Sequence, residues 1–248
     1  QAGSRKILKK TDAQISMEGS ECYGLAEQMK SPILAEKYLK LLDRLTAAHI
    51  GFEFTFSPSR SIQALVDACQ ASAFEFVMVG KYAMPGLRNA FLGPLAFRII
   101  GAIRRPIFVV PDQGPFAEID HITYAVDLTD YDPNVIRQVK LMASVFDAKL
   151  SIAHVNAELE ENKKESYLRT LERTISDTLD YPKVYYKFFD HSDALSGIQK
   201  FVTLNNSQLV AMINRKKFNW RNLFRRDESL TRRMTRNTKV PILAFPKY

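Results

Sequence analysis

The sequence predicts an α/β protein built from two tandem copies of one domain, each with a five-stranded parallel sheet between helices. Residues 77–111 and residues 211–246 carry the repeat, because each stretch is an apolar run, a turn, a helical stretch and a second apolar run opened by proline. Val79 lies 134 positions before Ile213, and the two prolines match at nearly the same offset. A fixed offset of this kind indicates two copies of one supersecondary layout.

The composition supports a globular protein of two domains. The chain has 248 residues, of which 46% are apolar and 25% charged, and two domains of about 120 residues fit the usual size range. No apolar run approaches the ~20 residues that span a bilayer, so no membrane insertion is expected. The two cysteines, Cys22 and Cys69, indicate a reducing compartment, and we expect a cytoplasmic protein.

The second copy, residues 120–248, shows every element of such a domain in order. Strands are expected at 121–126, 150–155, 183–189, 208–213 and 241–245, and helices at 133–146, 158–179 and from Ser192 or Asp193 to Leu204, before a basic helical segment. Pro133 fits the first turn of its helix, with Asp132 as the N-cap. Alternating strands and helices give a parallel sheet with right-handed crossovers.

The first copy, residues 1–112, matches this layout from its second helix onward. We expect a helix at 33–48, a strand at 52–56, a helix capped by Ser59 or Ser61 and ending at Ala71, and strands at 74–79 and 107–110. Arg5 to Lys9 is the one strand candidate before the first of these helices, where two are expected. The sequence therefore predicts that the N-terminal part of this copy is incomplete: its start is missing from the sequence, a disordered piece was skipped, or this half is trimmed. Residues 112–119 are the expected linker.

The positive charge is concentrated at the C-terminal end. From Arg215 to Tyr248 the sequence has eleven Lys and Arg residues against two acids. Such a segment attracts polyanions, and Phe218, Trp220 and Phe224 alternate with Arg as in stacking platforms for nucleic acids. The segment 215–236 is therefore a candidate polyanion or nucleic-acid site, and a solvated helix face is the alternative.

Spaced glycines follow the fourth strand of the first copy. With two tandem α/β units, they make residues 33–248 resemble the universal stress protein family in its two-domain form, whose fold is Rossmann-like and akin to the adenine nucleotide alpha-hydrolases. The family pattern is Gly, two residues, Gly, nine residues, then Gly followed by Ser or Thr. The residues of this segment that the resemblance assigns to nucleotide binding are Gly80, Lys81, Ala83, Gly86, Gly93 and Pro94.

The resemblance implies ATP as the cofactor of the first copy. Glycines let backbone N–H groups approach phosphate oxygens, and the following helix N-terminus favours an anion. Ala83 adds a Cβ and Pro94 removes both a hydroxyl and a backbone donor, so the expected ATP site is weakened. The alternative is that these glycines make a turn and allow close packing.

The second copy departs further from the family pattern. The corresponding positions are Asn214, Lys217, Asp227 and Glu228. Two acids where the last glycine and the hydroxyl would stand repel a triphosphate. Asp127 nevertheless ends the first strand of this copy, where the family carries an aspartate near the adenosine, and the alternative for Asp127 is to cap the next turn.

No catalytic group and no metal site is expected. The four histidines are scattered, His154 is expected in the core, and Asp190, His191 and Asp193 are expected to form a cap and loop. The sequence has no Walker A lysine motif, no CxxC and no HExxH. We therefore expect a non-enzymatic binding or regulatory module of the stress response, with polyanion binding or weak ATPase activity as alternatives.

The last strand of each copy is a candidate for edge-to-edge pairing. Ile107–Val110 and Ile242–Phe245 are apolar, and pairing would protect sheet edges that are otherwise exposed. The family resemblance implies either a pseudo-dimer within one chain or a homodimer of two chains through these fifth strands.

Overall fold

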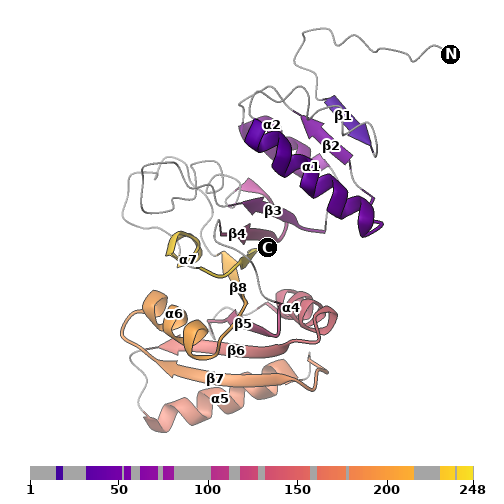
Figure 1. The fold of residues 1–248 in the computed structure, drawn as a ribbon. Helices are drawn as coiled ribbons and strands as arrows, with labels where there is room; N and C mark the ends of the chain where they lie inside the picture. Colours follow the sequence, from indigo (N-terminus) through magenta and orange to yellow (C-terminus); the bar gives the residue numbers. More distant parts are fainter. Residues whose placement is uncertain are drawn as a thin grey trace, which may run out of the picture. The chain divides into compact units, whose positions relative to one another are not determined.

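The structure is a computed structural model of the 248-residue chain (Figure 1). It describes residues 15–18, 32–51, 53–56, 62–71, 75–80, 102–111, 118–127, 132–156, 161–176, 179–214, 230–237 and 239–247.

The chain divides into two compact units, Gln1–Ala64 and Leu65–Tyr248. The division falls inside helix α2 (Ile62–Ala71), whereas the repeat boundary at residues 112–120 stays a prediction from the sequence. None of the described helices is both long and apolar enough to cross a membrane.

The described part of the first unit comprises helix α1, two short strands and the start of α2. Its elements are β1 (Ile15–Glu18), α1 (Pro32–Ala47) and β2 (Glu53–Phe56). Helix α1 is amphipathic, with Tyr38 and Leu42 buried. Strand β1 pairs antiparallel with β2, and this strand was not expected from the sequence; the expected strand Arg5 to Lys9 lies outside the described residues.

The second unit is built on one seven-stranded sheet in the order β3-β4-β9-β8-β5-β6-β7. The strands are β3 (Val77–Gly80), β4 (Ile107–Val110), β5 (His121–Ala125), β6 (Lys149–Asn156), β7 (Val184–Asp190), β8 (Leu209–Asn214) and β9 (Ile242–Pro246). Each agrees with an expected strand to within three residues at either end. The α/β class with a mainly parallel sheet is therefore confirmed.

The two repeats share this sheet through their last strands. All neighbouring strands in it are parallel except β4 and β9, which are antiparallel with Phe108 opposite Leu243. Both side chains are buried. The described strands thus form one continuous sheet and a separate pair instead of two five-stranded sheets, because the apolar edges of β4 and β9 join within one chain.

Helices cover both faces of the sheet. They are α4 (Pro133–Val145), α5 (Glu161–Ser176), α6 (Ala194–Leu204) and α7 (Leu230–Asn237). Helices α4 and α5 pack in one core cluster, with Ile136 and Ile175 fully buried, and α6 and α7 pack in a second cluster that includes Ile198 and Met234. Asp132 caps α4 by accepting the Asn134 N–H at 2.8 Å, as predicted.

Candidate functional site

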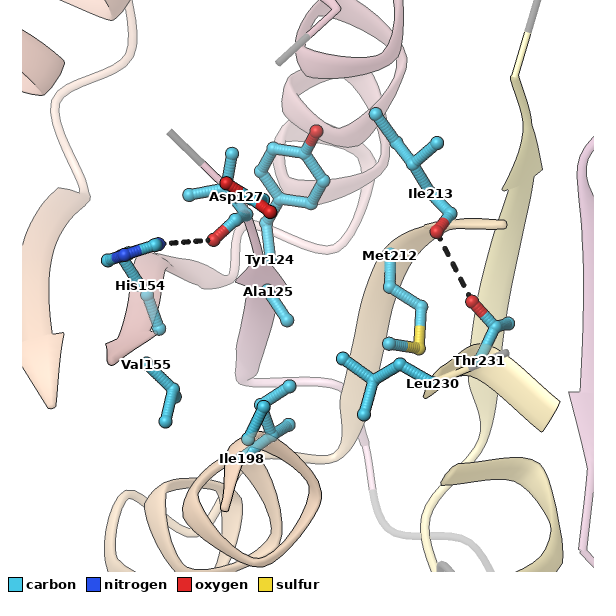
Figure 2. Close-up of a pocket in the computed structure, with 13 residues that line it drawn as sticks. Tyr124, Ala125, Asp127, His154, Val155, Ile198, Met212, Ile213, Leu230 and Thr231 are labelled. Atoms are coloured by element: carbon cyan, nitrogen blue, oxygen red, sulfur yellow. Dashed lines mark hydrogen bonds between the residues drawn. The ribbon is translucent and has the colours of Figure 1, made fainter. Parts of the chain in front are cut away.

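A pocket of about 260 Å³ lies where β5, β6 and β8 end. Parallel strands bring their carboxyl ends to one edge of the sheet, and open α/β sheets bind ligands at this edge. Figure 2 shows that its walls come from the ends of these three strands and from the first turns of helices. The lining residues from the two helices are Ala194, Ile198, Leu230 and Thr231.

The strand residues around the pocket alternate between the two faces of the sheet. Met212 belongs with residues of α6 and α7 to the core cluster on the pocket side, and Ala125 and Val155 pack against this cluster. Tyr124 belongs to the cluster with α4 on the opposite face. The body of the pocket is therefore apolar, as in most small-molecule sites.

His154 is part of the wall and is 8% exposed. Its Nδ1 lies 2.9 Å from the carbonyl oxygen of Val126. Because a carbonyl only accepts hydrogen bonds, Nδ1 carries the proton and donates it. The ring also packs against Phe188 with centroids 5.3 Å apart, so His154 holds the end of β5 against β6, in keeping with the expected core position.

Thr231 fixes the first turn of α7 against the end of β8. Its Oγ1 donates to the carbonyl oxygen of Ile213 at 3.2 Å, and the residue is 1% exposed (Figure 2). Its hydroxyl proton is used in that bond, so the oxygen is left with lone pairs that accept.

Helix α6 reaches the pocket through a cap and a close approach. The carboxylate of Asp193 accepts the N–H and the hydroxyl of Ser196, both at 2.8 Å, which makes Asp193, one of the two caps expected from the sequence, the N-cap of α6. At Gly197, a Cβ would overlap Cγ1 of Val155 and lie 2.8 Å from Cβ of His191. Glycine therefore lets α6 pack directly on the end of β6.

An ion pair joins the two helices whose first turns border the pocket. A guanidinium nitrogen of Arg233 in α7 lies 3.5 Å from a carboxylate oxygen of Asp193. The pKa of Asp193 is lowered, first by hydrogen bonds from Ser196 and then by Arg233. The carboxylate is therefore charged at neutral pH, where it caps α6 and pairs with Arg233.

The structure brings one predicted nucleotide residue into this pocket. Asp127 follows β5, is partly buried and is one of the residues that line the pocket (Figure 2). Its part in ligand binding stays a prediction. Residues 128–131, which Asp127 would cap in the alternative interpretation, lie outside the described residues.

The glycine segment of the first repeat is described only at its first position. Gly80 is the exposed last residue of β3, and a Cβ there would meet no atom within 4 Å. The described surroundings of Gly80 therefore do not require glycine. The other predicted residues of this segment lie outside the described residues, and they are Lys81, Ala83, Gly86, Gly93 and Pro94.

The sequence did not identify the pocket residues of α6 and α7. Ile198 and Thr231 belong to ordinary helical patterns, and only the packing of these helices on the sheet places them in the pocket that Asp127 also lines. The order of the strands is the sequence signal that could have located the pocket, because residues at the carboxyl ends of neighbouring parallel strands lie at one edge of the sheet. Within the described ranges, no group of three or more His, Cys, Asp or Glu side chains could hold a metal ion.

Comparisons with known proteins agree with this fold. No family model and no curated protein sequence matches the chain. Among solved structures, a universal stress protein from Archaeoglobus fulgidus DSM 4304 has a TM-score of 0.65 at 16% identity, covering 92% of this chain and 83% of that one. A universal stress protein from Pseudomonas aeruginosa UCBPP-PA14 has a TM-score of 0.58 at 12% identity, covering 76% and 69%. The chain therefore has the universal stress protein fold, as the sequence predicted.

Proposed function

We propose that the protein is a non-catalytic binding and regulatory module of the stress response, and that it binds an adenine nucleotide. One observation carries the proposal: the carboxyl edge of β5, β6 and β8 holds a pocket with Asp127 in its wall. Its volume of about 260 Å³ lies just under the usual ~300–1,000 Å³ of ligand sites. A pocket of this size fits one compact group such as a nucleoside.

The proposal keeps the two repeats as functional units. Residues 1–112 are the first, in which ATP is the proposed ligand of the segment from Gly80 to Pro94. Residues 120–248 are the second, which contains the pocket at Asp127. The two cysteines of the sequence support a reducing compartment such as the cytoplasm.

A regulatory role is preferred over catalysis because of the chemistry of the pocket wall. The titratable residues among the described lining are Tyr124, Asp127 and His154. Tyr124 belongs to the core cluster with α4, and the Nδ1 proton of His154 is given to a backbone carbonyl. Proton transfer needs a group within reach of the reacting atoms, and this bond leaves His154 in a structural role. Weak ATPase activity is the alternative. Release of phosphate over time, measured with ATP in the presence of magnesium, would reveal this activity.

Isothermal titration calorimetry on the full chain tests the proposal with ATP, AMP and adenosine, with and without magnesium. Asp127→Asn should weaken binding at the second repeat about tenfold, since hydrogen bonds to a charged group contribute ~1.5–3 kcal/mol. Gly93→Asp should abolish binding at the first repeat by placing a carboxylate beside the phosphates. Asp120→Asn is the matched control, because this exposed aspartate precedes β5 at the opposite end of the strand. Absence of binding to the wild-type chain would refute the proposal.

A second candidate function is polyanion binding through residues 215–236. Its support is the charge of the C-terminal segment, with eleven basic residues against two acids from Arg215 onward. Neutralised phosphates release counterions, so binding of a single-stranded oligonucleotide should weaken steeply with salt. A flat salt dependence would exclude this function.

A further inference from the structure

We infer that one face of β6 and β7 binds single-stranded nucleic acid, with a base stacked on Tyr185 and phosphates held by Lys149 and Lys187. These three residues, the Tyr185 surface, belong to neighbouring strands at the β7 edge of the sheet (Figure 1). They are neither part of the pocket lining nor of the basic segment 215–236. The site is therefore additional to the proposed nucleotide pocket.

Strand β7 turns Tyr185 and Lys187 away from helix α5. Val184 and Tyr186 pack against the core cluster that α4 and α5 share. Successive side chains of a strand point to opposite faces of the sheet, so Tyr185 and Lys187 lie on the other face. Tyr185 is 46% exposed and Lys187 is also exposed, which leaves an aromatic ring and an amine open to a ligand.

Helix α6 packs on the same face at the carboxyl end of β7. The ring of Phe189 lies 5.7 Å from that of Phe201 in α6, edge to face. Phe189 is partly buried by this contact, whereas Tyr185, four residues earlier in the strand, keeps almost half of its surface exposed. The amino half of β7 thus presents its side chains beyond the helix.

Strand β6 contributes a second lysine next to small side chains. The parallel register places Ser151 beside Tyr185 and Ala153 beside Lys187. Lys149 is exposed and lies two residues before Ser151, on the same face. From the spacings of a sheet, the Cα atoms of Lys149 and Tyr185 are roughly 8 Å apart, and Lys187 lies about 7 Å further along β7. The two amines therefore flank the ring.

A hydrogen-bond relay fixes the sheet beside Tyr185. Nδ1 of His121 lies 2.8 Å from the carbonyl oxygen of Asn205, and Nε2 lies 2.8 Å from Oγ of Ser151. Because the carbonyl accepts, Nδ1 donates, and Nε2 of the neutral ring accepts the Ser151 proton. The relay ties β5, β6 and the end of α6 together, and a surface held rigid before binding loses less entropy when a ligand binds.

The charge of this surface comes from Lys149 and Lys187. A third lysine, Lys183, precedes β7, but its Nζ lies 2.6 Å from the carboxylate of Asp147 and 2.9 Å from the carbonyl oxygen of the same residue. Its charge is largely offset by that pair, so we assign the phosphate contacts to the other two lysines.

An exposed ring between two amines matches a single strand better than it matches an acidic peptide. Proteins bind single strands by stacking bases on aromatic side chains while basic groups follow the phosphates. An acidic peptide would use the lysines and gain little from a flat ring. The ring of Tyr185 is therefore the feature that distinguishes the two kinds of partner.

The test is fluorescence anisotropy of a labelled oligothymidine on the full chain at several salt concentrations. Tyr185→Ala and Tyr185→Leu should weaken binding about tenfold, and Tyr185→Phe should bind as the wild type does, because the loss is that of one stacked base. Lys149→Ala and Lys187→Ala should each reduce the slope of log affinity against log salt by about 0.7. Arg137→Ala is the control, because it removes one exposed charge from α4 on the opposite face, and it should change neither value.

The double variant Arg225→Ala and Arg226→Ala separates this site from the basic segment 215–236. Loss of binding in that double variant alone, with wild-type affinity in Tyr185→Leu, would overturn the inference. Competition by polyglutamate as effective as that by unlabelled oligothymidine would also overturn it, in favour of an acidic partner. Absence of oligothymidine binding by the wild-type chain would overturn it as well and leave the adenine nucleotide proposal standing. Circular dichroism of each variant verifies that the fold is kept.

Discussion

Ile107 of β4 lies opposite Ala244 of β9, in the antiparallel pair that joins the two repeats. Both residues are buried, at 1% and 2% exposure. An unpaired strand edge is a template for association with another chain. Strands β4 and β9 therefore cover each other's edge within one chain.

Ile107→Ala should destabilise the second unit by about 2–5 kcal/mol, since it removes buried atoms at the junction and leaves a cavity. Met78→Ala is the control on the neighbouring strand, because Met78 is 62% exposed, and its effect should stay within about 0.5 kcal/mol. Urea denaturation followed by circular dichroism measures both free energies of unfolding. Equal effects of the two substitutions would show that the junction does not stabilise the unit.

Asp193→Ala should lower the free energy of unfolding by about 1 kcal/mol at neutral pH, because it removes the N-cap of α6. The pKa of Asp193 is lowered in the folded state, so its contribution is present above the ordinary pKa and is lost as the pH falls through the folded value. The difference between the variant and the wild type should therefore shrink below about pH 4. Denaturation at several pH values measures it, with Asp180→Ala, an exposed aspartate outside any cap, as the control. A difference that grows on acidification would contradict the assignment.

Gly197→Ala should destabilise the protein although alanine favours helices. The gain in helix propensity is about 1 kcal/mol, whereas forcing a methyl group into a packed contact costs ~1–3 kcal/mol. The added Cβ would press on Val155, a pocket residue, and on Cβ of His191, so ligand affinity should fall as well. Thermal unfolding and calorimetry measure both effects. Adding Val155→Ala should recover part of the stability, and a simple sum of the two losses would argue against the contact.

Tyr181→Phe should cost about 1 kcal/mol, because the hydroxyl bonds two backbone carbonyls at the end of α4. It donates toward Ala148 at 2.6 Å and toward Ala143 at 3.1 Å. Burial raises the pKa of Tyr181, so the folded state holds this proton more strongly than the unfolded chain. Stability from this group is full below about pH 10 and is lost as the pH rises through the folded pKa.

Urea titrations at neutral and alkaline pH test this prediction, with Tyr185→Phe as the control because Tyr185 is 46% exposed on β7. The Tyr181 variant should lose less stability than the wild type at high pH. The same alkaline loss in both proteins would assign it to other groups.

The described strands and helices of residues 120–248 could be predicted from sequence because local and tertiary signals agree there. Asp132 and Pro133 mark the start of α4, and buried strands such as β8 and β9 are short apolar runs between turns. Helices and strands can be predicted from one sequence when the capping residues, the apolar periodicity and the burial pattern agree in this way.

The first repeat and the pocket were harder for identifiable reasons. The strand Ile15–Glu18 has four residues of mixed polarity, and its antiparallel partner Glu53–Phe56 lies far away in the chain. Asp127 can be predicted as a site residue because it follows a strand that the sequence predicts. Thr231 was not found, because its role depends on the bond to Ile213, which the helix pattern does not encode.

The antiparallel junction also fixes the direction in which each repeat faces. Strand β3 runs parallel to β4, and β8 runs parallel to β9, so the carboxyl end of β3 at Gly80 and that of β8 near Asp127 point to opposite edges of the sheet. Ligands bound at the two proposed sites would therefore lie at opposite edges of the sheet and would not compete for the same space.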